Sequence, residues 1–404
     1  MSGDKNMSED NQINVFIIGS KGYTQNYGGW EAFVHGLLDN WEDKNVHFYA
    51  FEKVSSKAEE ETIIVNNVVC IRICEVEQGS SAMMKYDKKC TDYARDYIKK
   101  NSIPNPILFH LGVRIGPYLY FMRSKFKKEG ILLMENPAGA EWRRTKWNKV
   151  VQIYLFMSAM MMAKSTDCMV CDNEGIRNLY RKILIGKKPK LECVAYGVQS
   201  VLPVNNEISE DARSFFEKWN IKKDQYYLIL GRYVPENNYE MMIKAFMKSN
   251  TKRKLLIITN YKTELQKFHR HILKSTDYEN DERIIMAGAL YNKEILHYVR
   301  QYARGYIHGH SVGGTNPGLL EAMSETNVCM LFDVSFNKCV GNNAALYFEN
   351  EEELTSLIDN VDKMDNEKME KFGEKARERM KQEYAWKHIV HGYNIVIHNL
   401  LKNR

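Results

Sequence analysis

Short apolar runs alternate with stretches of helical apolar spacing along most of the chain. Residues 14–19 form an apolar run that ends in glycine, as is typical of a buried parallel strand. Residues 30–41 follow with apolar side chains at helical spacing. The alternation predicts further strands at 46–51, 68–73, 107–110, 131–134 and 167–171, and helices that include 86–100 and 147–164. Strands that alternate with helices predict a parallel sheet covered on both faces.

The pattern pauses near residues 195–203 and then resumes. It predicts strands at 226–231, 254–259, 283–287, 305–308 and 328–333, and helices at 240–247, at 293–302, from about Pro317 and over the last forty residues. A chain of 404 residues exceeds what one hydrophobic core usually serves. We therefore expect a disordered leader over 1–12, domains over 13–200 and 201–380, and a C-terminal helix over 381–404.

Composition narrows the class of protein. With 44% apolar and 27% charged residues the chain is ordinary globular protein, which excludes disorder, collagen-like repeats and a disulfide-stapled miniprotein. Eight scattered cysteines and no signal peptide predict a reducing cytosol. Cys168 and Cys171 favour a core strand over a zinc site, because no second pair lies nearby. No apolar run is long enough to span a membrane, and residues 150–163 are expected to be a packed helix.

The net charge of +6 is concentrated between Arg114 and Lys149, where nine basic residues face three acidic ones. Aromatic side chains interleave with them: Tyr118, Tyr120, Phe121, Phe126, Trp142 and Trp147. This mixture suits an anionic bilayer or single-stranded nucleic acid, and a solvated basic face is the plain alternative. We expect peripheral contact with an anionic membrane and no binding of nucleic acid.

Each half contains a glycine pair between a predicted strand and a predicted helix. Gly28-Gly29 precedes the first helix, and Gly313-Gly314 precedes the helix that begins near Pro317. Glycine permits close approach of a ligand to the backbone, and free N–H groups at a helix start attract phosphate. The alternative is that each pair only makes a tight turn. Because ligands bind beyond the carboxyl ends of such strands, the two pairs together predict a cleft for a phosphorylated ligand.

A nicotinamide-dependent dehydrogenase is disfavoured. Gly19 and Gly22 resemble part of a dinucleotide loop, but the full glycine spacing is absent. Glu52 is also a poor match for the acidic residue that should end the second strand. Two charged residues fit a sugar nucleotide better than a nicotinamide dinucleotide. Arg232 follows a glycine that ends a strand, where a guanidinium can clamp a diphosphate. Glu321 lies one turn inside a helix. A carboxylate there suits paired sugar hydroxyls, although a solvated glutamate is the alternative.

At these residues the sequence resembles the retaining glycosyltransferases of family 4, which have the GT-B fold. More narrowly it resembles bacterial capsule and cell-wall rhamnosyltransferases that act on lipid-linked sugars. The resemblance spans about 14–395 and lies in Ile-Gly-Ser-Lys-Gly (18–22), Tyr-Gly-Gly-Trp-Glu (27–31), Arg-Ile-Gly-Pro (114–117), Asn-Pro-Ala-Gly-Ala-Glu-Trp-Arg-Arg-Thr-Lys-Trp (136–147), Gly-Arg-Tyr-Val-Pro-Glu-Asn-Asn (231–238) and His-Gly-His-Ser-Val-Gly-Gly-Thr-Asn-Pro-Gly-Leu-Leu-Glu-Ala-Met (308–323).

The resemblance implies a fold and a set of roles. The fold is α/β, with two Rossmann-like domains facing across a cleft and a C-terminal helix that crosses back to the first domain. The catalytic residues would be Arg232, which neutralises the leaving group, Glu321, which binds the ribose, and His310 at the sugar. The remaining implied residues are Gly28, Gly29, Asn238, Gly288, Leu290, Gly313, Gly314, Thr315 and Asn316 for the donor, and Arg114, Glu141, Trp142 and Arg144 for the acceptor.

The sequence departs from the family at three places. Gly313 replaces the first of two glutamates, and a diphosphate-binding lysine near Asn237 is absent; both changes match the rhamnosyltransferase branch. Ala138 replaces an aspartate, and Ala159 similarly stands where a helix glutamate is usual. A front-face retaining mechanism tolerates the missing carboxylate, because the leaving phosphate takes the acceptor proton. Loss of acceptor affinity is therefore the expected effect of Ala138.

These features predict transfer of L-rhamnose from dTDP-rhamnose, with retention, to a lipid-diphosphate-linked saccharide at the inner face of a bacterial cell membrane. No cofactor or metal is expected, because Asp-x-Asp is absent from the sequence. The alternatives are another nucleotide-sugar donor, a sugar-nucleotide epimerase of the same fold, and a catalytically silent subunit that binds nucleotide sugar.

Overall fold

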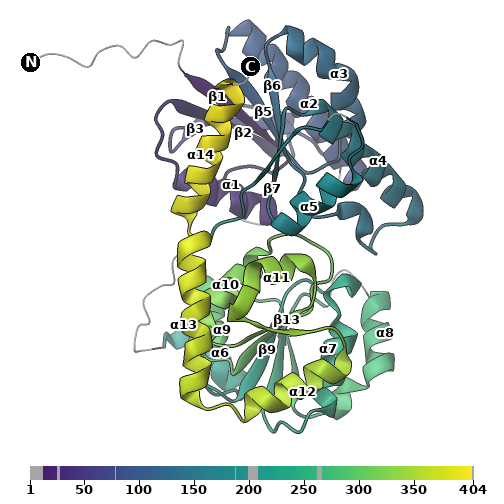
Figure 1. Ribbon diagram of the computed structural model, residues 1–404, viewed down its shortest axis with the longest axis vertical. Coiled ribbons are helices and arrows are strands. Elements are labelled where there is room, and N and C mark those ends of the chain that lie inside the picture. The colour runs from purple at the N-terminus through teal and green to yellow at the C-terminus, as the bar shows by residue number, and fades with distance from the viewer. Residues whose placement is uncertain are drawn as a thin grey trace, which may run out of the picture. The chain divides into compact units, whose positions relative to one another are not determined.

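The structure is a computed structural model that describes residues 12–24, 28–77, 79–186, 188–198, 208–261 and 266–402. The leader expected over 1–12 lies almost entirely outside these residues. The chain divides into two compact α/β units (Figure 1). The first consists of Met1–Trp142, Trp147–Gly197 and Trp386–Arg404, and the second of Arg143–Lys146 and Val198–Ala385.

The first unit is built on an eight-stranded sheet, counted over the described residues, in the order β3-β4-β2-β1-β5-β6-β7-β8. All neighbouring strands are parallel except β3 and β4. The strands are β1 (Ile13–Ile18), β2 (Val46–Val54), β3 (Thr62–Val65), β4 (Val68–Cys74), β5 (Pro106–Leu111), β6 (Leu132–Asn136), β7 (Cys168–Cys171) and β8 (Lys190–Cys193). The helices are α1 (Gly29–Asp39), α2 (Ser80–Lys100), α3 (Gly116–Lys128), α4 (Lys149–Ser165), α5 (Glu174–Ile183) and α14 (Trp386–Lys402).

The second unit has a six-stranded parallel sheet, counted in the same way, in the order β11-β10-β9-β12-β13-β14. Its strands are β9 (Tyr226–Leu230), β10 (Lys254–Ile258), β11 (Ile284–Gly288), β12 (Gly305–His308), β13 (Cys329–Phe332) and β14 (Leu346–Phe348). Its helices are α6 (Glu210–Lys218), α7 (Tyr239–Lys248), α8 (Gln266–Thr276), α9 (Lys293–Gln301), α10 (Pro317–Glu325), α11 (Ser335–Gly341), α12 (Glu351–Asp362) and α13 (Asn366–Glu383). The predicted α/β class with two parallel sheets is confirmed.

Strand order locates the functional edge of each sheet. In the first unit successive strands run outward in opposite directions from β1 and β5, and in the second unit from β9 and β12. Such a reversal of strand order is where sheets of this class bind ligands, beyond the carboxyl ends of the strands. Gly19 follows β1 with a φ of 113°, and a Cβ there would collide with the carbonyl of Leu111 at the end of β5. Glycine is therefore required where the chain leaves β1.

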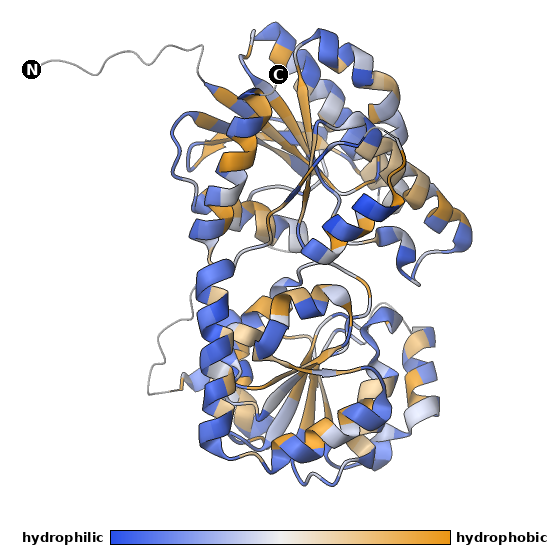
Figure 2. Cartoon of the chain, in the orientation of Figure 1, coloured by the Kyte–Doolittle hydropathy of each residue, from blue (hydrophilic) through white to orange (hydrophobic). Residues whose placement is uncertain are grey.

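Buried apolar strands hold both units together, and Figure 2 shows the strands of both sheets as largely hydrophobic. β1, with the sequence Ile-Asn-Val-Phe-Ile-Ile, is buried along its whole length because it has a parallel neighbour on each side. Each strand predicted from an apolar run is present, with ends that differ by a few residues. No helix among the described residues is both long and apolar enough to cross a membrane.

The sequence analysis predicted β4, at 68–73, but missed β3 and with it the hairpin that the two strands form. Asn66 and Asn67 form its two-residue turn, with φ of 47° and 66°. Positive φ at both positions is the type I′ geometry that favours asparagine and glycine in tight hairpins. The signal was present as Asn-Asn between two β-branched runs, Thr62–Val65 and Val68–Cys74.

The C-terminal residues form two helices rather than one continuous helix, because α13 ends at Glu383 and α14 begins at Trp386. α14 belongs to the first unit, where the Trp386 indole lies against two glycines, Gly36 of α1 and Gly197. A Cβ at either glycine would collide with that ring. His398 Nε2 lies 2.8 Å from Asp43 Oδ2 and attaches the far end of α14.

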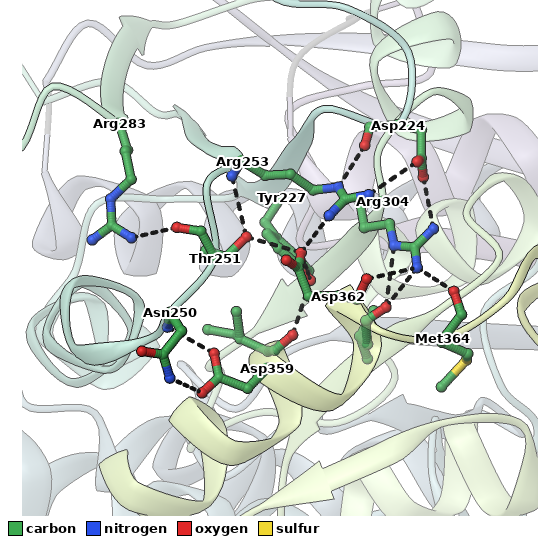
Figure 3. A network of polar contacts seen from close by, with 12 residues as sticks. Asp224, Tyr227, Asn250, Thr251, Arg253, Arg283, Arg304, Asp359, Asp362 and Met364 are labelled. Carbon is green, nitrogen blue, oxygen red and sulfur yellow. Dashed lines mark hydrogen bonds and ion pairs between the residues drawn. The ribbon is translucent and has the colours of Figure 1, made fainter.

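A network of ionic and hydrogen-bonding side chains joins the amino ends of three strands in the second unit (Figure 3). Asp224, Arg253 and Arg304 lie just before β9, β10 and β12. Arg253 Nη1 donates to Asp362 Oδ1 at 2.6 Å, and Arg304 Nη2 donates to the carbonyl oxygen of Val361 at 2.7 Å. The network therefore fixes the end of α12 to the sheet edge opposite the carboxyl ends that carry the candidate site.

Candidate active site

Two adjacent strands of the second unit, β9 and β12, end in glycines from which the candidate site is built. Gly231 follows β9, and Gly309 follows β12. A Cβ at Gly309 would collide with the carbonyl oxygen of Asn237 and with Met242, and a Cβ at Gly231 would lie 3.3 Å from Cε1 of His310. The missing side chains thus let the two loops approach each other closely.

A short 3₁₀ turn, η4 (Pro235–Asn237), connects these loops. The Asn237 side-chain amide donates to the carbonyl oxygen of Arg232 at 2.7 Å. Asn238 follows in the left-handed conformation, with a φ of 55°, and its amide donates to the carbonyl oxygen of Gly309 at 2.9 Å. Asn238, expected to contact the donor, is therefore also the residue that fastens the loop after β9 to the loop after β12.

His310 is buried beside a second histidine. Its ring stacks on His308 with centroids 4.1 Å apart and planes within 7°. Burial, reinforced by the neighbouring His308 and by the charges of Arg232 and Arg144, holds the pKa of His310 well below its usual range. His310 Nδ1 has no hydrogen-bond partner among the described residues. The ring is therefore neutral at physiological pH and carries a buried polar atom that a ligand can satisfy.

Arg232 and Arg144 place positive charge around this neutral ring. Arg232 is exposed at the end of β9, and both guanidinium groups lower the pKa of His310. Since Arg144 belongs to the segment Arg143–Lys146, which is part of the second unit, both charges lie within one unit. Two guanidinium groups beside an uncharged, buried imidazole make an electrostatic environment that favours an anion.

Glu236 is a buried carboxylate that the sequence analysis missed. Thr145 Oγ1 donates to its Oε2 at 2.9 Å, and Arg144 Nη1 lies 4.0 Å from its Oε1. Its backbone oxygen accepts hydrogen bonds from the N–H and hydroxyl of Ser311 at 2.9 and 2.8 Å. Glu236 therefore holds Arg144 and the loop after β12 beside the same turn. The available signal was its position in Arg-Tyr-Val-Pro-Glu, next to the predicted Arg232.

The second glycine pair leads into the start of α10. The Asn316 side-chain oxygen caps this helix by accepting from the N–H groups of Gly318 at 2.9 Å and Leu319 at 3.3 Å. A Cβ at Gly313 would meet only Phe336, at 3.9 Å, so the backbone there is accessible, while Thr315 is buried. The predicted turn from strand into helix is present. The side-chain oxygen of Asn316 is used in the cap, which leaves its amide nitrogen for the expected contact with the donor sugar.

Glu321, the expected ribose ligand, is half-exposed and ion-paired. Arg300 of α9 is buried and bridges two carboxylates of α10: its Nη2 contacts Glu321, and its Nη1 lies 3.1 Å from Glu325 Oε2. His297 Nδ1 lies 2.9 Å from the other oxygen of Glu325. A charged group held at both ends has little rotational freedom, so Arg300 fixes the orientation of Glu321. Sequence reasoning did not identify Arg300, because its partners lie on another helix.

The end of β11 is linked to the same sheet edge. Thr259 bridges two of the strand ends, since its N–H donates to the carbonyl oxygen of Gly288 at 3.0 Å and its hydroxyl donates to the carbonyl oxygen of Gly231 at 2.6 Å. Gly288 has a φ of 85° and open space where a Cβ would be, and Leu290 follows two residues later. The backbone at 288–290 is thus available to a flat ligand such as a nucleobase.

In the first unit the predicted glycine pair precedes α1. Gly28 has a φ of 137°, and a Cβ there would collide with the carboxylate of Glu31. Glu31 is engaged, because its Oε1 accepts from the N–H of Lys21 at 2.7 Å. Gly29 has nothing within 4 Å of a Cβ position. Among the described residues, the pair thus leaves open space at Gly29, while the Glu31 carboxylate lies against Gly28.

The four expected acceptor residues have different environments. Arg114 ion-pairs with the buried Asp87, at 2.7 Å, and donates to the carbonyl oxygen of Gly19, so it supports the loop after β1. Glu141 is partly buried and interacts electrostatically with Arg114. Trp142 packs edge-on against the aromatic rings of α4 and α5. Arg144 belongs to the second unit and the other three to the first.

One buried acid of the first unit was not predicted. Glu135, near the end of β6, is 1% exposed, and neither of its carboxylate oxygens has a partner among the described residues. Burial raises the pKa of Glu135 well above its usual range, so the group is uncharged at neutral pH. Its sequence signal was a glutamate inside an apolar run that was predicted to be a buried strand.

A cavity of about 440 Å³ lies beside α7 of the second unit. Its lining includes Asn238, Glu240, Lys244 and His271, of which only Asn238 is a predicted site residue. Glu240 is paired internally with both Lys244, at 2.7 Å, and His271, at 2.9 Å. Because these charges neutralise one another, the glycine-bounded strand ends remain the better candidate for binding a phosphorylated ligand.

Comparison with known proteins agrees with this division of the chain. The family model of a domain of unknown function, DUF1972, matches residues 12–199, and the model of the glycosyl transferases group 1 matches residues 211–379. No curated protein matches the chain.

Solved structures share the fold at low sequence identity. The sucrose-phosphate synthase of Thermosynechococcus elongatus superposes with a TM-score of 0.78 at 14% identity, covering 97% of this chain and 100% of that one. The α,α-trehalose-phosphate synthase (UDP-forming) of Burkholderia vietnamiensis gives 0.69 at 10% identity, over 96% and 100%. The Anabaena protein HepE in complex with UDP gives 0.67 at 10% identity, over 96% and 100%.

These findings define the class first: the protein has the GT-B fold. Within that class, residues 211–379 match the group 1 glycosyltransferases, and a DUF1972 region over residues 12–199 precedes this domain. Its activity is accordingly glycosyl transfer.

Proposed function

We propose that the protein transfers L-rhamnose from dTDP-rhamnose to a lipid-diphosphate-linked saccharide, with retention of configuration, at the inner face of a bacterial cell membrane. One observation carries the donor part of this proposal: the neutral, buried His310, whose pKa the charges of Arg232 and Arg144 lower, lies at the joined ends of β9 and β12 and has a buried Nδ1 without a partner among the described residues. This environment is suited to a pyrophosphate next to a neutral sugar. HepE, which shares the fold, binds UDP.

The proposed donor contacts divide the nucleotide sugar into its parts. Arg232 and the backbone around Gly28-Gly29 and Gly313–Thr315 would contact the diphosphate, because accessible N–H groups and a guanidinium offset its charge. Glu321, oriented by Arg300, would accept hydrogen bonds from two ribose hydroxyls or, for a deoxyribose, from the one that remains. The backbone of 288–290 would contact the base, and His310 and Asn316 the sugar.

In the proposed reaction the bond between the sugar C1 and the phosphate oxygen breaks while the acceptor oxygen bonds to C1 on the same face. The acceptor proton passes to the departing phosphate oxygen, so no protein carboxylate is needed as the base. Arg232 would stabilise the charge that develops on the diphosphate. His310, being neutral, would position a sugar hydroxyl through a hydrogen bond rather than supply a proton. Ala138 is compatible with this mechanism, although the acceptor loses a possible carboxylate contact.

The choice of L-rhamnose rests on the resemblance and on Gly313. A glutamate at that position in the wider family reads sugar hydroxyls, and glycine removes that carboxylate. The acceptor residues we propose are Arg114, Glu141, Trp142 and Arg144. Because no Asp-x-Asp is present, guanidinium groups and helix termini would take the place of a metal ion, and full activity is expected in a chelator.

The test is a donor panel incubated with the full chain and a synthetic lipid-diphosphate saccharide, with free nucleotide and glycosylated lipid measured separately. We expect release of TDP. Because the configuration is retained, dTDP-rhamnose with the α configuration should give an α-linked product. Release from UDP-glucose or GDP-mannose instead would overturn the choice of donor. A strict requirement for Mg²⁺ or Mn²⁺ would contradict the metal-free site.

The same assay separates the two other functions that the sequence allows. A sugar-nucleotide epimerase would convert its donor without an acceptor, and a silent subunit would bind the donor yet release no nucleotide. Dependence of nucleotide release on the lipid-linked acceptor supports the transferase over both.

A further inference from the structure

Helix α4 of the first unit is apolar on its outward face as well as on its packed face. Its inner face contributes buried side chains, including Leu155, Ala159 and Met162. Its outward face presents Val150 (77% exposed), Ile153 (60%) and Met157 (52%) at helical spacing. A helix that is apolar all round is normally buried on all sides. The outward face of α4 is therefore expected to contact another apolar surface. The packing expected from the sequence applies only to the inner face.

Helix α3 packs against α4 and continues the apolar surface. The two helices are in close contact at Gly116, whose N–H donates to Ser158 Oγ at 2.9 Å and where a Cβ would collide with the Ser158 carbonyl. Further along α3, Phe121 is 79% exposed and Tyr120 is exposed as well. We call the exposed groups of these two packed helices the α3–α4 face, and Figure 2 colours α4 as largely hydrophobic.

Both helices carry lysines, and neither contains a carboxylate. α3 exposes Lys125, Lys127 and Lys128, and α4 exposes Lys149 and Lys164. Lys127, Lys128 and Lys149 form no side-chain hydrogen bond or ion pair with any residue that the structure describes. Two aromatic side chains of the basic stretch turn away from this face, because Phe126 is buried and Tyr118 bonds to Asp92.

We infer that the α3–α4 face binds an anionic phospholipid bilayer, with Val150, Ile153, Met157 and Phe121 inserted at the headgroup boundary and the lysines on the headgroup charges. An exposed apolar helix face bordered by lysines is the arrangement of helices that lie in the plane of a membrane surface. Each lysine near an anionic surface strengthens binding about fivefold. A second copy of the chain is the weaker candidate, since two such faces would bring lysines against lysines.

The inference extends the proposed function, because a lipid-linked acceptor requires the enzyme at a membrane. It is argued, however, from side chains outside the donor and acceptor sites. Binding to lipid and release of nucleotide can therefore fail independently, and the experiment measures both.

The experiment is co-sedimentation of the full chain with vesicles of phosphatidylcholine, alone or mixed with phosphatidylglycerol. Wild type should bind the mixed vesicles at least tenfold more tightly. Val150→Ser/Ile153→Ser should reduce that binding at least tenfold, and Lys125→Glu/Lys128→Glu should abolish the preference for anionic lipid. Ile64→Ser is the matched control, because Ile64 is 73% exposed on β3 of the same unit, and it should bind as wild type does.

Three results would overturn the inference: equal binding to both kinds of vesicle, no binding to either, or unchanged binding by Val150→Ser/Ile153→Ser. A wild-type dimer in solution that this double variant converts to monomer would assign the face to a second copy instead. Release of TDP in detergent solution should be unchanged in the folded variants. Vesicle binding by a wild-type chain that releases no nucleotide would contradict the proposed function and leave the membrane face intact.

Discussion

Ala138 is a single residue whose backbone conformation does not suit its side chain. It has a φ of 56°, in the left-handed region that costs an L-residue about 1 kcal/mol or more. Its N–H donates to Asn136 Oδ1 at 3.0 Å, so the conformation is held by the preceding loop. We expect Ala138→Gly to raise the free energy of unfolding by up to about 1 kcal/mol, measured by urea denaturation.

Ala140→Gly is the control for that measurement, because Ala140 is buried two residues later and lies outside the left-handed region. It should lose stability instead. A loss of stability in Ala138→Gly as large as that in the control would contradict the strain assigned to Ala138.

Three buried histidines make the fold sensitive to acid. Burial lowers the pKa of His110 and of His308 to about 3, and burial is also the main cause of the low pKa of His310. Each group has a folded-state pKa below the value of about 6.5 in an unfolded chain. As pH falls the unfolded chain therefore binds more protons. Stability is fully present above about pH 6.5 and is lost progressively toward about pH 3.

We expect the free energy of unfolding to fall by roughly 1.4 kcal/mol per pH unit for each of these histidines once the pH is well below 6.5. Urea denaturation between about pH 7 and pH 5 measures this slope. His308→Gln should remove the contribution of one such histidine from the slope, whereas substitution of the exposed His391 should leave the slope unchanged. An equal slope in the His308 variant would show that the ring is not buried in its neutral form.

At the scale of elements, the packing of α9 against α10 determines how Glu321 is presented. Arg300 holds Glu321 and Glu325 together, and removing it frees Glu321, the proposed ribose ligand, to rotate. We expect Arg300→Gln to raise the Kd for TDP about tenfold, measured by calorimetric titration. Glu321→Gln should have a larger effect, and the double variant should resemble Glu321→Gln, because the two side chains act as one unit.

Arg283→Gln provides the control for Arg300. Arg283 forms an ion pair with Asp281 at 2.6 Å in the same unit, before β11, but contacts no predicted donor residue. Its variant should lose stability and keep the affinity for TDP. Additive losses of affinity in Arg300→Gln/Glu321→Gln would assign Arg300 a contact of its own with the nucleotide.

Local patterns predicted most elements, and the exceptions have physical reasons. Apolar runs located β1, β9 and β12 because strands buried on both faces contain almost only apolar residues. β4 was predicted from its apolar run, but β3 was missed because it is only four residues long and its pairing is indicated mainly by the two turn residues Asn66 and Asn67. The exposed face of α4 was missed because sequence alone does not show which side of an apolar helix is covered.

The residues of the candidate site likewise include some that the sequence could identify and some that it could not. Glycines and Arg232 could be identified from the sequence because strand ends and helix starts constrain the residue types that can occupy them. Glu236 and Arg300 could not, since each acts through partners that are distant in sequence: Thr145 for Glu236, and Glu321 for Arg300. The stacking of His308 on His310 likewise depends on tertiary packing, although both residues lie in one motif.

For the whole molecule, the boundary between α13 and α14 separates side chains that stabilise different units. α14 begins at Trp386, and its indole fills the space that Gly36 and Gly197 leave open in the first unit. The residues just before it belong to the second unit, where Tyr384 accepts a backbone hydrogen bond from Val198 at 2.8 Å. A substitution at Trp386 should therefore destabilise the first unit and leave the donor site of the second unchanged.

We expect Trp386→Ala to cost about 3 kcal/mol, because the indole leaves a cavity beside two glycines that cannot fill it. For a unit of this size the loss corresponds to a fall of about 6–12 °C in Tm. Scanning calorimetry of the full chain with TDP added in excess tests the assignment, because most of the proposed nucleotide contacts are in the second unit and its transition should rise more than that of the first. Trp386→Ala should lower the other transition and keep the TDP-dependent shift. If the variant instead lost the shift while its other transition stayed in place, α14 would be supporting the donor site rather than the first unit.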